Sequence, residues 1–218
     1  GEALIAVAIA NATGEITVSR DLLRFSPLGV DAIVRQELSR AAGELQENAF
    51  LTGDGSQKPL GLFTASADGI STARDVSSGN LTTDIQSDGM INALYSLKAI
   101  YMRNATWMFH RTVVRQIRKL KTGDGQYLWA PGLIAGQPDT ILARPLMMSE
   151  WSPSTFTTGL YVGIVGDFNW YWIVDAMDME LLLLQEVSAR TNQNVYLARM
   201  KLDAAPVKEE AFARVTLA

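Results

Sequence analysis

The sequence contains no cysteine and one histidine, and these two scarcities exclude several kinds of site. Without cysteine there is no disulfide framework, no thiolate metal ligand and no cysteine nucleophile. A single histidine, His110, cannot make an ordinary zinc site, and a Ser-His-Asp triad would have to use it. No Gly-x-Ser-x-Gly motif supplies a matching serine nucleophile. The composition therefore argues against the common zinc-dependent and nucleophilic hydrolases.

Charged residues are also scarce. They make up 19% of the 218 residues, against about 25% in an average soluble domain. Hydrophobic residues reach 48%, enough for a substantial core in one large domain or two small ones. The low charge therefore suggests that part of the surface is covered by another molecule. A monomer with a large core is the plainer alternative.

The balance of charge argues against tight binding to nucleic acid. The net charge is −4, the isoelectric point is about 5.1, and the densest basic stretch is RKLK at residues 118–121. A protein that grips phosphates normally carries a broader basic stripe of lysine and arginine.

Long hydrophobic runs and targeting signals are missing. No apolar run is long enough to span a bilayer. The N-terminus lacks the charged region and cleavage pattern of a signal peptide, and it begins with Gly1 where an initiator methionine would stand. We therefore expect a processed or truncated product.

A long amphipathic pattern predicts one dominant helix over about residues 27–51. Ser26 suits the N-cap and Pro27 suits the first helical position. Apolar residues then recur three or four positions apart, which places them on one face of the helix. A helix of this length is about twice the mean of roughly three turns, so we expect a stiff spine. The apolar stripe consists of Val30, Val34, Leu38, Ala41, Leu45 and Ala49.

The stretch AFLTGDGSQKPLGLF at residues 49–63 raises the question of phosphate binding. A Walker loop requires Gly-Lys-Ser/Thr, but Lys58 is followed by Pro59. A dinucleotide loop requires spaced glycines at the start of a helix, whereas Gly53 and Gly55 stand at the end of one. Because a helix end presents carbonyl groups and the negative pole of its dipole, we interpret this loop as a structural corner.

The remaining patterns predict a mixed α+β fold whose middle is an inserted second lobe. A strand is predicted at 14–24, a surface crossing at 64–83, a helix at 84–102, a strand at 106–110 and a helix at 111–121. Strands are then predicted at 141–150, at 160–175 with a turn at Gly166-Asp167, at 179–187, at 194–203 and at 211–218. Because terminal strands often meet in one sheet, we expect residues 64–178 to form the inserted lobe.

The candidate chemical groups favour structural interpretations. We interpret His110 as a partly buried structural residue. The acidic candidates lie mostly in turns, where aspartate is common for its hydrogen bonding. A carboxylate pair such as Asp175 and Asp178 is the sharper alternative. The acidic candidates are Asp54, Asp124, Asp167, Asp175 and Asp178.

Two tryptophans, Trp170 and Trp172, alternate along a predicted strand around Tyr171. Core packing is the plainer interpretation, and a sugar-stacking platform is the alternative. Both rings exposed in one cleft beside paired carboxylates would favour a carbohydrate-binding protein or enzyme. The sequence identifies no catalytic, cofactor-binding or metal site.

Four segments in order resemble the major capsid proteins of tailed bacteriophages and prophages that have the HK97-type fold. NAFLTGDGSQKPLGLF at 48–63 is similar to the exit of that family's spine helix. The segment at 104–129 resembles its strand, helix and Asp-Gly-x-Tyr-Leu-Trp motif. LARPLMMSEWSP at 142–153 resembles a family strand, with Ala143-Arg144 in place of the usual Gly-x. VGDFNWYWIVD at 165–175 resembles Gly-Asp-Phe-x-x-Tyr-x-Ile-Val-Asp, with Trp172 after Tyr171.

This resemblance implies a division into two domains. Residues 1–63 and 179–218 would form the peripheral domain, and residues 64–178 the axial domain. The family's N-terminal arm and most of its extended loop would be absent. Some family members join subunits through a lysine in that loop and an asparagine elsewhere. Asn192 and Asn194 lie in the corresponding region, where an ordinary strand-edge turn is the plainer interpretation.

The resemblance also implies the function. The chain would be a head protein without enzymatic activity or cofactors that forms pentamers and hexamers in an icosahedral shell around a DNA genome. Expected partners are copies of itself, a scaffolding segment or protein, a protease and a portal, with only non-specific contact to DNA and none to a membrane. Assembly would occur in the cytoplasm of the bacterial host and the protein would end in the virion. The alternative is an encapsulin-type nanocompartment, which encloses cargo protein.

Overall fold

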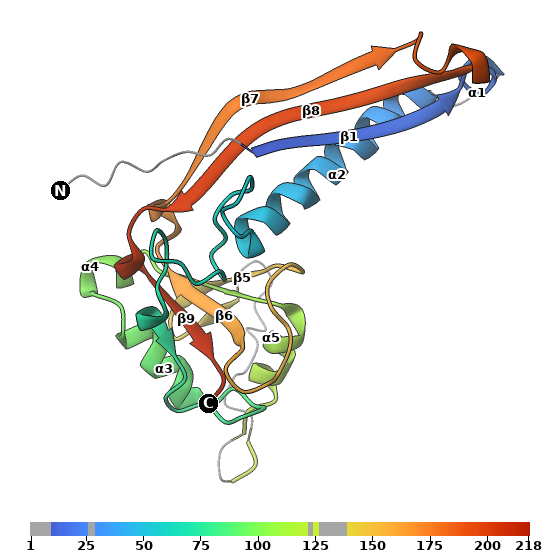
Figure 1. Cartoon of the computed structure of the whole chain (residues 1–218). Helices are drawn as coiled ribbons and strands as arrows, with labels where there is room; N and C mark the ends of the chain where they lie inside the picture. Colours follow the sequence, from blue (N-terminus) through green and yellow to red (C-terminus); the bar gives the residue numbers. More distant parts are fainter. Residues whose placement is uncertain (1–9, 26–28, 122–123, 127–138) are drawn as a thin grey trace. The chain divides into compact units, whose positions relative to one another are not determined.

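The computed structural model describes residues 10–25, 29–121, 124–126 and 139–218, which fall into two compact units (Figure 1). Unit 1 comprises residues 1–61 and 173–204, and unit 2 comprises residues 62–172 and 205–218. Each unit has its own sheet and its own buried apolar cluster. Both helices and strands are present, as the α+β prediction required.

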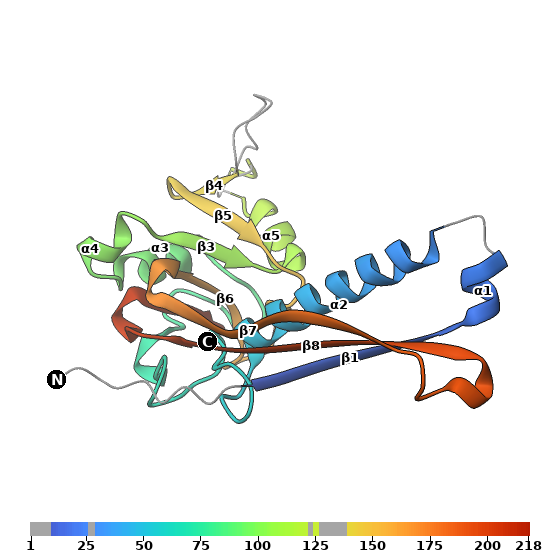
Figure 2. The same cartoon turned by 90° about the horizontal axis from the view of Figure 1, so that it is seen from above.

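Unit 1 combines a three-stranded sheet with one long helix. The sheet has the order β1-β8-β7, and β1 pairs antiparallel with β8 from Ala10 opposite Leu202 to Ser19 opposite Gln193. Figures 1 and 2 both show helix α2 running alongside β1 and β8. The elements of this unit are β1 (Ala10–Ser19), α1 (Arg20–Phe25), α2 (Val30–Thr52), β7 (Tyr171–Leu184), the 3-10 turn η3 (Ala189–Thr191) and β8 (Gln193–Pro206).

The helix α2 is held to the sheet through the first half of its apolar stripe. Val34 and Leu38 are buried and lie in one cluster with Val18, Tyr196 and Ala198. Since one face of a helix is covered by one face of a sheet, this burial supplies most of the stability that positions α2.

A polar clamp fixes the first turn of α2. The hydroxyl of Tyr196 donates to Asp31 Oδ1 at 2.9 Å, and Arg35 Nε donates to Asp31 Oδ2 at 2.8 Å. The hydrogen bond from Arg35 lowers the pKa of the Asp31 carboxyl, and the bond from Tyr196 adds to the effect. Burial raises the pKa of Tyr196. The clamp therefore ties the start of the helix to β8.

The spine helix predicted at 27–51 is present as α2, with small differences at its start. The residue before it is Gly29, and the helix begins at Val30. The predicted cap Ser26 and first residue Pro27 lie outside the described residues. The helix ends where Gly53 donates its backbone N–H to the Ala49 carbonyl at 2.9 Å.

Unit 2 is built on a six-stranded mixed sheet of order β2-β9-β6-β3-β5-β4. Its helices are α3 (Ser87–Tyr95), α4 (Ala99–Met102) and α5 (Arg111–Arg118), and its 3-10 turns are η1 (Thr72–Arg74), η2 (Phe168–Trp170) and η4 (Glu209–Ala211). Its strands are β2 (Asp75–Val76), β3 (Thr106–Phe109), β4 (Thr140–Ile141), β5 (Arg144–Met148), β6 (Tyr161–Gly166) and β9 (Phe212–Thr216).

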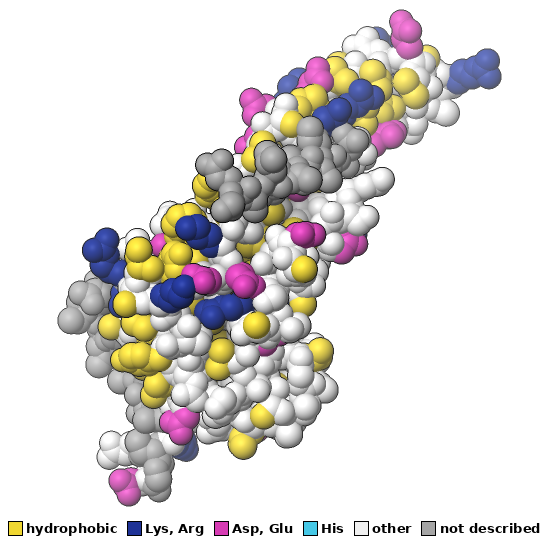
Figure 3. All heavy atoms as spheres, turned by 60° about the vertical axis from the view of Figure 1, so that its left-hand side comes forward, with side chains coloured by type: hydrophobic (Ala, Val, Ile, Leu, Met, Phe, Trp, Pro, Cys, Tyr) yellow, Lys and Arg dark blue, Asp and Glu magenta, His cyan; other side chains and the backbone are white. Residues whose placement is uncertain are grey.

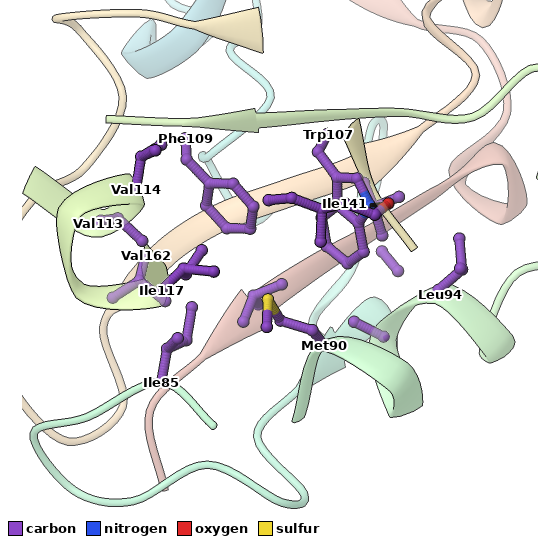
Figure 4. Close-up of a cluster of buried hydrophobic side chains, with 14 of the residues drawn as sticks. Ile85, Met90, Leu94, Trp107, Phe109, Val113, Val114, Ile117, Ile141 and Val162 are labelled. Carbon is purple, nitrogen blue, oxygen red and sulfur yellow. Dashed lines mark hydrogen bonds between the residues drawn. The ribbon is translucent and has the colours of Figure 1, made fainter. Parts of the chain in front are cut away.

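The core of unit 2 is centred on two aromatic rings from β3 (Figure 4). Trp107 and Phe109 alternate along the strand, so both point to the same side, and their rings stack with centroids 5.4 Å apart. Trp107 Nε1 donates to the Ile141 carbonyl at 3.0 Å, which satisfies its one polar atom. Helix α5 contributes Val113 and Ile117 to the same cluster.

A buried ion pair joins β2 to β9. Asp75 stands directly opposite Arg214 in the parallel ladder, and Arg214 Nε lies 2.7 Å from Asp75 Oδ1. Arg214 Nη2 also donates to the Ser71 carbonyl at 2.9 Å, and its guanidinium carbon lies 4.5 Å from the centre of the Tyr161 ring. The Tyr161 hydroxyl donates to Asp75 Oδ2 at 3.2 Å. Burial raises the pKa of Tyr161.

Several predicted elements have different bounds. The strand predicted at 14–24 stops at Ser19, and residues 20–25 turn into helix α1. The helix predicted at 84–102 is two helices, because the chain breaks after Tyr95, where the Ser96 hydroxyl donates to the Ala93 carbonyl at 2.7 Å. The strand predicted at 141–150 is a hairpin of β4 and β5, with positive φ angles at Leu142 and Ala143.

We expected the strands near the two ends of the chain to meet in one sheet. The second-to-last strand, β8, lies in the same sheet as β1, but the last strand, β9, does not. β8 pairs with β1, whereas β9 lies between β2 and β6 in the sheet of unit 2. All five residues of β9 are buried, so the strand needs cover on both of its faces. Residues 205–218, expected with the first domain, therefore belong to unit 2 by their contacts.

Candidate functional surfaces

The glycine loop after α2 uses its polar groups within itself. Gly61 donates its N–H to the Gly53 carbonyl at 2.9 Å, and Ser56 donates its N–H to Asp54 Oδ1 at 3.0 Å. This second bond lowers the pKa of Asp54, and Lys58 lies 3.8 Å from the same carboxylate. A Cβ on Gly53 would lie 2.2 Å from the Pro59 carbonyl oxygen. These donors are engaged in closing a tight corner and do not face a common anion position.

His110 is buried at the start of α5 and serves as its N-cap. Its Nδ1 accepts the backbone N–H of Thr112 at 3.2 Å, so the hydrogen lies on Nε2 in this arrangement. Nε2 lies 3.2 Å from Glu150 Oε2, and the other oxygen of Glu150 lies 3.3 Å from Arg111 Nε. The imidazole thus joins the helix start to the segment after β5.

The acidic candidates do not converge. Asp167 is buried and its Oδ1 accepts the Asn169 N–H at 3.2 Å, which starts the turn η2. Asp175 and Asp178 are exposed on β7, and their odd spacing in a strand puts them on opposite faces. Asp124 is exposed. Within the described ranges, no three His, Asp or Glu side chains are grouped so that they could hold a metal ion.

The two tryptophans do not form an open pair. Trp170 contacts the ring of Tyr101 edge-on at 5.9 Å, and Lys208 Nζ lies 4.5 Å from the centre of the Trp170 ring. Trp172 is 54% exposed. Since Trp170 is engaged within unit 2, the platform expected of a carbohydrate-binding site is not assembled.

The two asparagines named from the resemblance serve the end of unit 1. Asn192 adopts a left-handed conformation with φ of 55°, and its carbonyl accepts the Arg20 N–H at 3.0 Å. Asn194 is buried in β8, and its Oδ1 accepts from Arg20 Nε at 2.9 Å. Both therefore hold the β1–α1 junction against β8.

Exposed apolar side chains are concentrated on β7. The strand has one neighbour in the sheet order, β8, so its other edge is unpaired among the described strands. Long edge strands with exposed apolar side chains are surfaces that normally pair with or are covered by another molecule. We call this surface the β7 edge, and it consists of Ile173, Val174, Met179 and Leu183.

A half-open apolar groove lies between α2 and the sheet of unit 1. Its volume is about 200 Å³. Leu38 and Leu45, both on the predicted stripe of α2, line it; Leu38 is buried, whereas Leu45 is 49% exposed. Ala41, Met179 and Met200 complete the apolar wall. The second half of the stripe therefore lacks the cover that the first half has.

Unit 2 exposes large apolar side chains as well. Figure 3 shows hydrophobic side chains at the surface of one face of the molecule, interspersed with basic and acidic ones. The large apolar side chains of unit 2 that are more than half exposed are Leu81, Tyr95, Ile100, Met147, Met148 and Trp172.

Comparison with known proteins relates the sequence to one protein family. Residues 4–217 match the family described as the phage capsid family. No curated protein matches the sequence. None of the helices in the described residues is long and apolar enough to cross a membrane.

Solved structures with the same fold include three informative examples. The capsid of an empty GTA particle is 23% identical with a TM-score of 0.85, over 97% of this chain and 74% of that one. A structure of Gordonia phage Cozz is 16% identical with a TM-score of 0.68, over 96% and 70%. The holo-SrpI encapsulin complex from Synechococcus elongatus is 13% identical with a TM-score of 0.67, over 95% and 73%.

Proposed function

The chain belongs to the phage capsid family, and we propose that it is the major head protein of a tailed phage or prophage. The fold is HK97-like, and the protein is a structural capsid component. The observation that carries the proposal is the family match over residues 4–217. In this role the chain binds copies of itself, as pentamers and hexamers, to form an icosahedral shell around DNA.

The two units are proposed to take the two roles of the family. Unit 1, with α2 as its spine, is the peripheral domain. Unit 2, including β9, is the axial domain, which meets its neighbours at the capsomer centre. A closed shell needs many moderate contacts related by rotation, so that errors can be corrected during growth while the completed shell is stable. The β7 edge and the exposed apolar residues of unit 2 supply surfaces for such contacts.

We propose no catalytic role and no cofactor for the chain. Three of the polar groups considered as chemical candidates have a local structural partner: His110 caps α5, Asp167 starts η2 and Asp54 closes the corner after α2. Asp124, Asp175 and Asp178 are exposed. The proposed partners beyond copies of the chain are a scaffolding segment or protein, a protease and a portal. Assembly is proposed to occur in the cytoplasm of the host. With a net charge of −4, contact with packaged DNA is proposed to be non-specific.

The test is expression of the complete reading frame in bacteria, followed by electron microscopy and analysis of the particle contents. Closed angular shells, either empty or containing scaffold and protease, are expected. Shells that contain one specific enzyme and no such assembly factors would favour an encapsulin-type compartment, whose fold this chain shares. A stable monomer at every concentration would refute the assembly role.

A further inference from the structure

Helix α1 stands at the end of unit 1 where α2 begins (Figures 1 and 2), and one of its faces is apolar and exposed. Leu22 and Phe25 are three residues apart and so lie on the same face; Leu22 is 52% exposed and Phe25 is 81% exposed. Leu23 instead packs inward, against the cluster that contains Val18 and Val34. We call Leu22 and Phe25 the α1 knob.

The half-open groove beside α2 is large enough for one phenyl ring. Its volume is about 200 Å³, and an apolar cavity of about 150 Å³ is enough to hold a benzene molecule. Ala41 and Ala42 line it from α2, and their short side chains leave the space open. Met179 and Met200 line it from the sheet, and the sulfur of methionine makes favourable contacts with aromatic rings. The groove therefore suits an aromatic side chain that has no polar atom.

Phe25 is the exposed side chain that meets this requirement. Among the described residues, the exposed aromatic side chains are those of Phe25, Tyr95, Trp151 and Trp172. A tyrosine hydroxyl or a tryptophan N–H needs a hydrogen-bond partner when it is buried. The phenyl ring of Phe25 has no such group, so a mostly apolar groove can accept it without leaving an unsatisfied donor.

The ring of Phe25 cannot occupy the groove of its own chain. Leu23 of α1 and Val30, the first residue of α2, pack against the same cluster, so α1 lies beside the start of α2. The α2 residues that line the groove begin eight residues later, at Leu38, and extend to Leu45. At 1.5 Å per residue these positions are about 12 and 22 Å further along the helix axis, which is farther than a phenylalanine side chain extends. A Phe25 ring in the groove must therefore come from a second copy.

The charges near the two surfaces are complementary. Arg24 is adjacent to Phe25, is exposed, and makes no ion pair within the described residues. The part of α2 that lines the groove also carries Glu37 and Glu44, which share one arginine, Arg40. Arg24 of a second copy would therefore meet an excess of negative charge beside the groove.

We propose that Phe25 of one copy inserts into the α2 groove of a second copy, with Leu22 packed against the rim. This proposal rests on the proposed function and assigns one of its contacts between subunits. Because the α1 knob and the groove are different surfaces, the contact is heterologous, and copies joined in this way form a closed ring when the rotation between them allows it.

Two substitutions test the contact from its two sides. Phe25→Ser removes an exposed side chain, so the free chain should unfold at an unchanged urea concentration. The protein concentration needed for assembly should rise at least about tenfold, because the burial of a phenyl ring is lost. Ala41→Leu should raise it as well, because the larger side chain occupies the groove even though it adds apolar surface. Ile33→Ala is the matched control, since Ile33 is an exposed apolar residue of α2 that does not line the groove.

A photochemical coupling experiment identifies the partner surface. Phe25→benzoylphenylalanine keeps an aromatic ring at the α1 knob, and irradiation couples this ring to carbon atoms in direct contact. Shells are assembled from unlabelled chains with this substitution and nitrogen-15-labelled chains without it, and are then digested for mass spectrometry. We expect joined peptides of mixed isotope content that link position 25 to the peptides of Leu45, Met179 or Met200. Ile33→benzoylphenylalanine, treated in parallel, should give no product with these peptides.

The outcomes separate this inference from the proposed function. If wild-type shells form and Phe25→Ser assembles at the same concentration, the insertion is refuted and the capsid role stands. Coupling from position 25 only to unit 2, to another protein or within a single chain also refutes the insertion. If the wild-type chain forms no shells, the proposed function fails. The same coupling between chains in solution then decides on the insertion, and the absence of a joined product refutes it.

Discussion

Removing Asp75 should destabilise unit 2 strongly, because it leaves the charge of Arg214 buried and unpaired. The Arg214 side chain is fully buried, whereas that of Asp75 is 19% exposed. Arg214 Nη1 already lacks a partner among the described residues. In Asp75→Ala the guanidinium retains its bond to the Ser71 carbonyl and its contact with the Tyr161 ring, but its counter-charge is gone.

The size of the effect follows from the burial of the two partners. Breaking a buried ion pair by removing one partner costs about 3–5 kcal/mol, and the partial exposure of Asp75 places this case near 3 kcal/mol. Arg214→Met removes the buried charge and leaves Asp75 bonded to the Tyr161 hydroxyl, so it should cost about 1–2 kcal/mol. The double variant should then be about 2 kcal/mol more stable than the sum of the single losses predicts.

Urea unfolding, monitored by tryptophan fluorescence, measures the change in the free energy of unfolding of unit 2. All five tryptophans lie between residues 107 and 172, within unit 2. Asp75→Asn is the matched control, because it keeps the shape and the hydrogen-bonding oxygen while removing the charge. A loss below about 1 kcal/mol for Asp75→Ala, or additive losses in the double variant, would refute the view that Arg214 depends on this carboxylate.

Two further predictions concern unit 1. Gly43 lies inside α2, and an added Cβ there would meet no atom within 4 Å other than the helix's own nearby backbone and its chain neighbours, so Gly43→Ala should stabilise the helix by about 0.5–1 kcal/mol. Gly53→Ala should cost about 1–3 kcal/mol, because its Cβ would lie 2.2 Å from the Pro59 carbonyl oxygen. Urea unfolding monitored by circular dichroism tests both signs. The folded-state pKa of Asp31 is lowered, so its clamp adds stability above the unfolded value of about 4 and loses it as pH falls through the folded value. In Asp31→Asn the melting temperature should therefore fall less between neutral pH and about pH 2 than it does in the wild-type chain. Thermal unfolding across this range measures the difference, and identical pH profiles for the two chains would contradict the prediction.

Periodic apolar patterns predicted the elements that carry their own burial. The helix α2 was predicted because Val34 and Leu38 recur at the helical period. The strand predicted at 106–110 corresponds to β3, in which buried Trp107 and Phe109 alternate with half-buried Thr106 and Met108. Both patterns reflect a face that packs locally. A helix or a strand can therefore be predicted from the sequence wherever one of its faces is buried and the other is exposed.

The elements that were missed depend on contacts distant in sequence. The strand β9 was predicted at 211–218, but not its sheet: it pairs with β6 and β2, and its Arg214 meets Asp75, 139 residues earlier, a partner that no local pattern records. The turn at Leu142 and Ala143 requires positive φ at two residues other than glycine, for which the sequence gives no signal.

The apolar stripe of α2 is longer than the cover that unit 1 gives it. Val34 and Leu38 are buried, yet Leu45 continues the same helical face and is 49% exposed beside an open groove. An apolar position costs solubility unless something covers it, so a stripe that extends beyond the local core is a pattern suited to burial in a larger assembly. The same reasoning applies to β7, where Ile173, Val174 and Leu183 are apolar but exposed in the single chain. The low share of charged residues and the exposed part of the α2 stripe are therefore both features of a surface suited to contact with neighbouring copies.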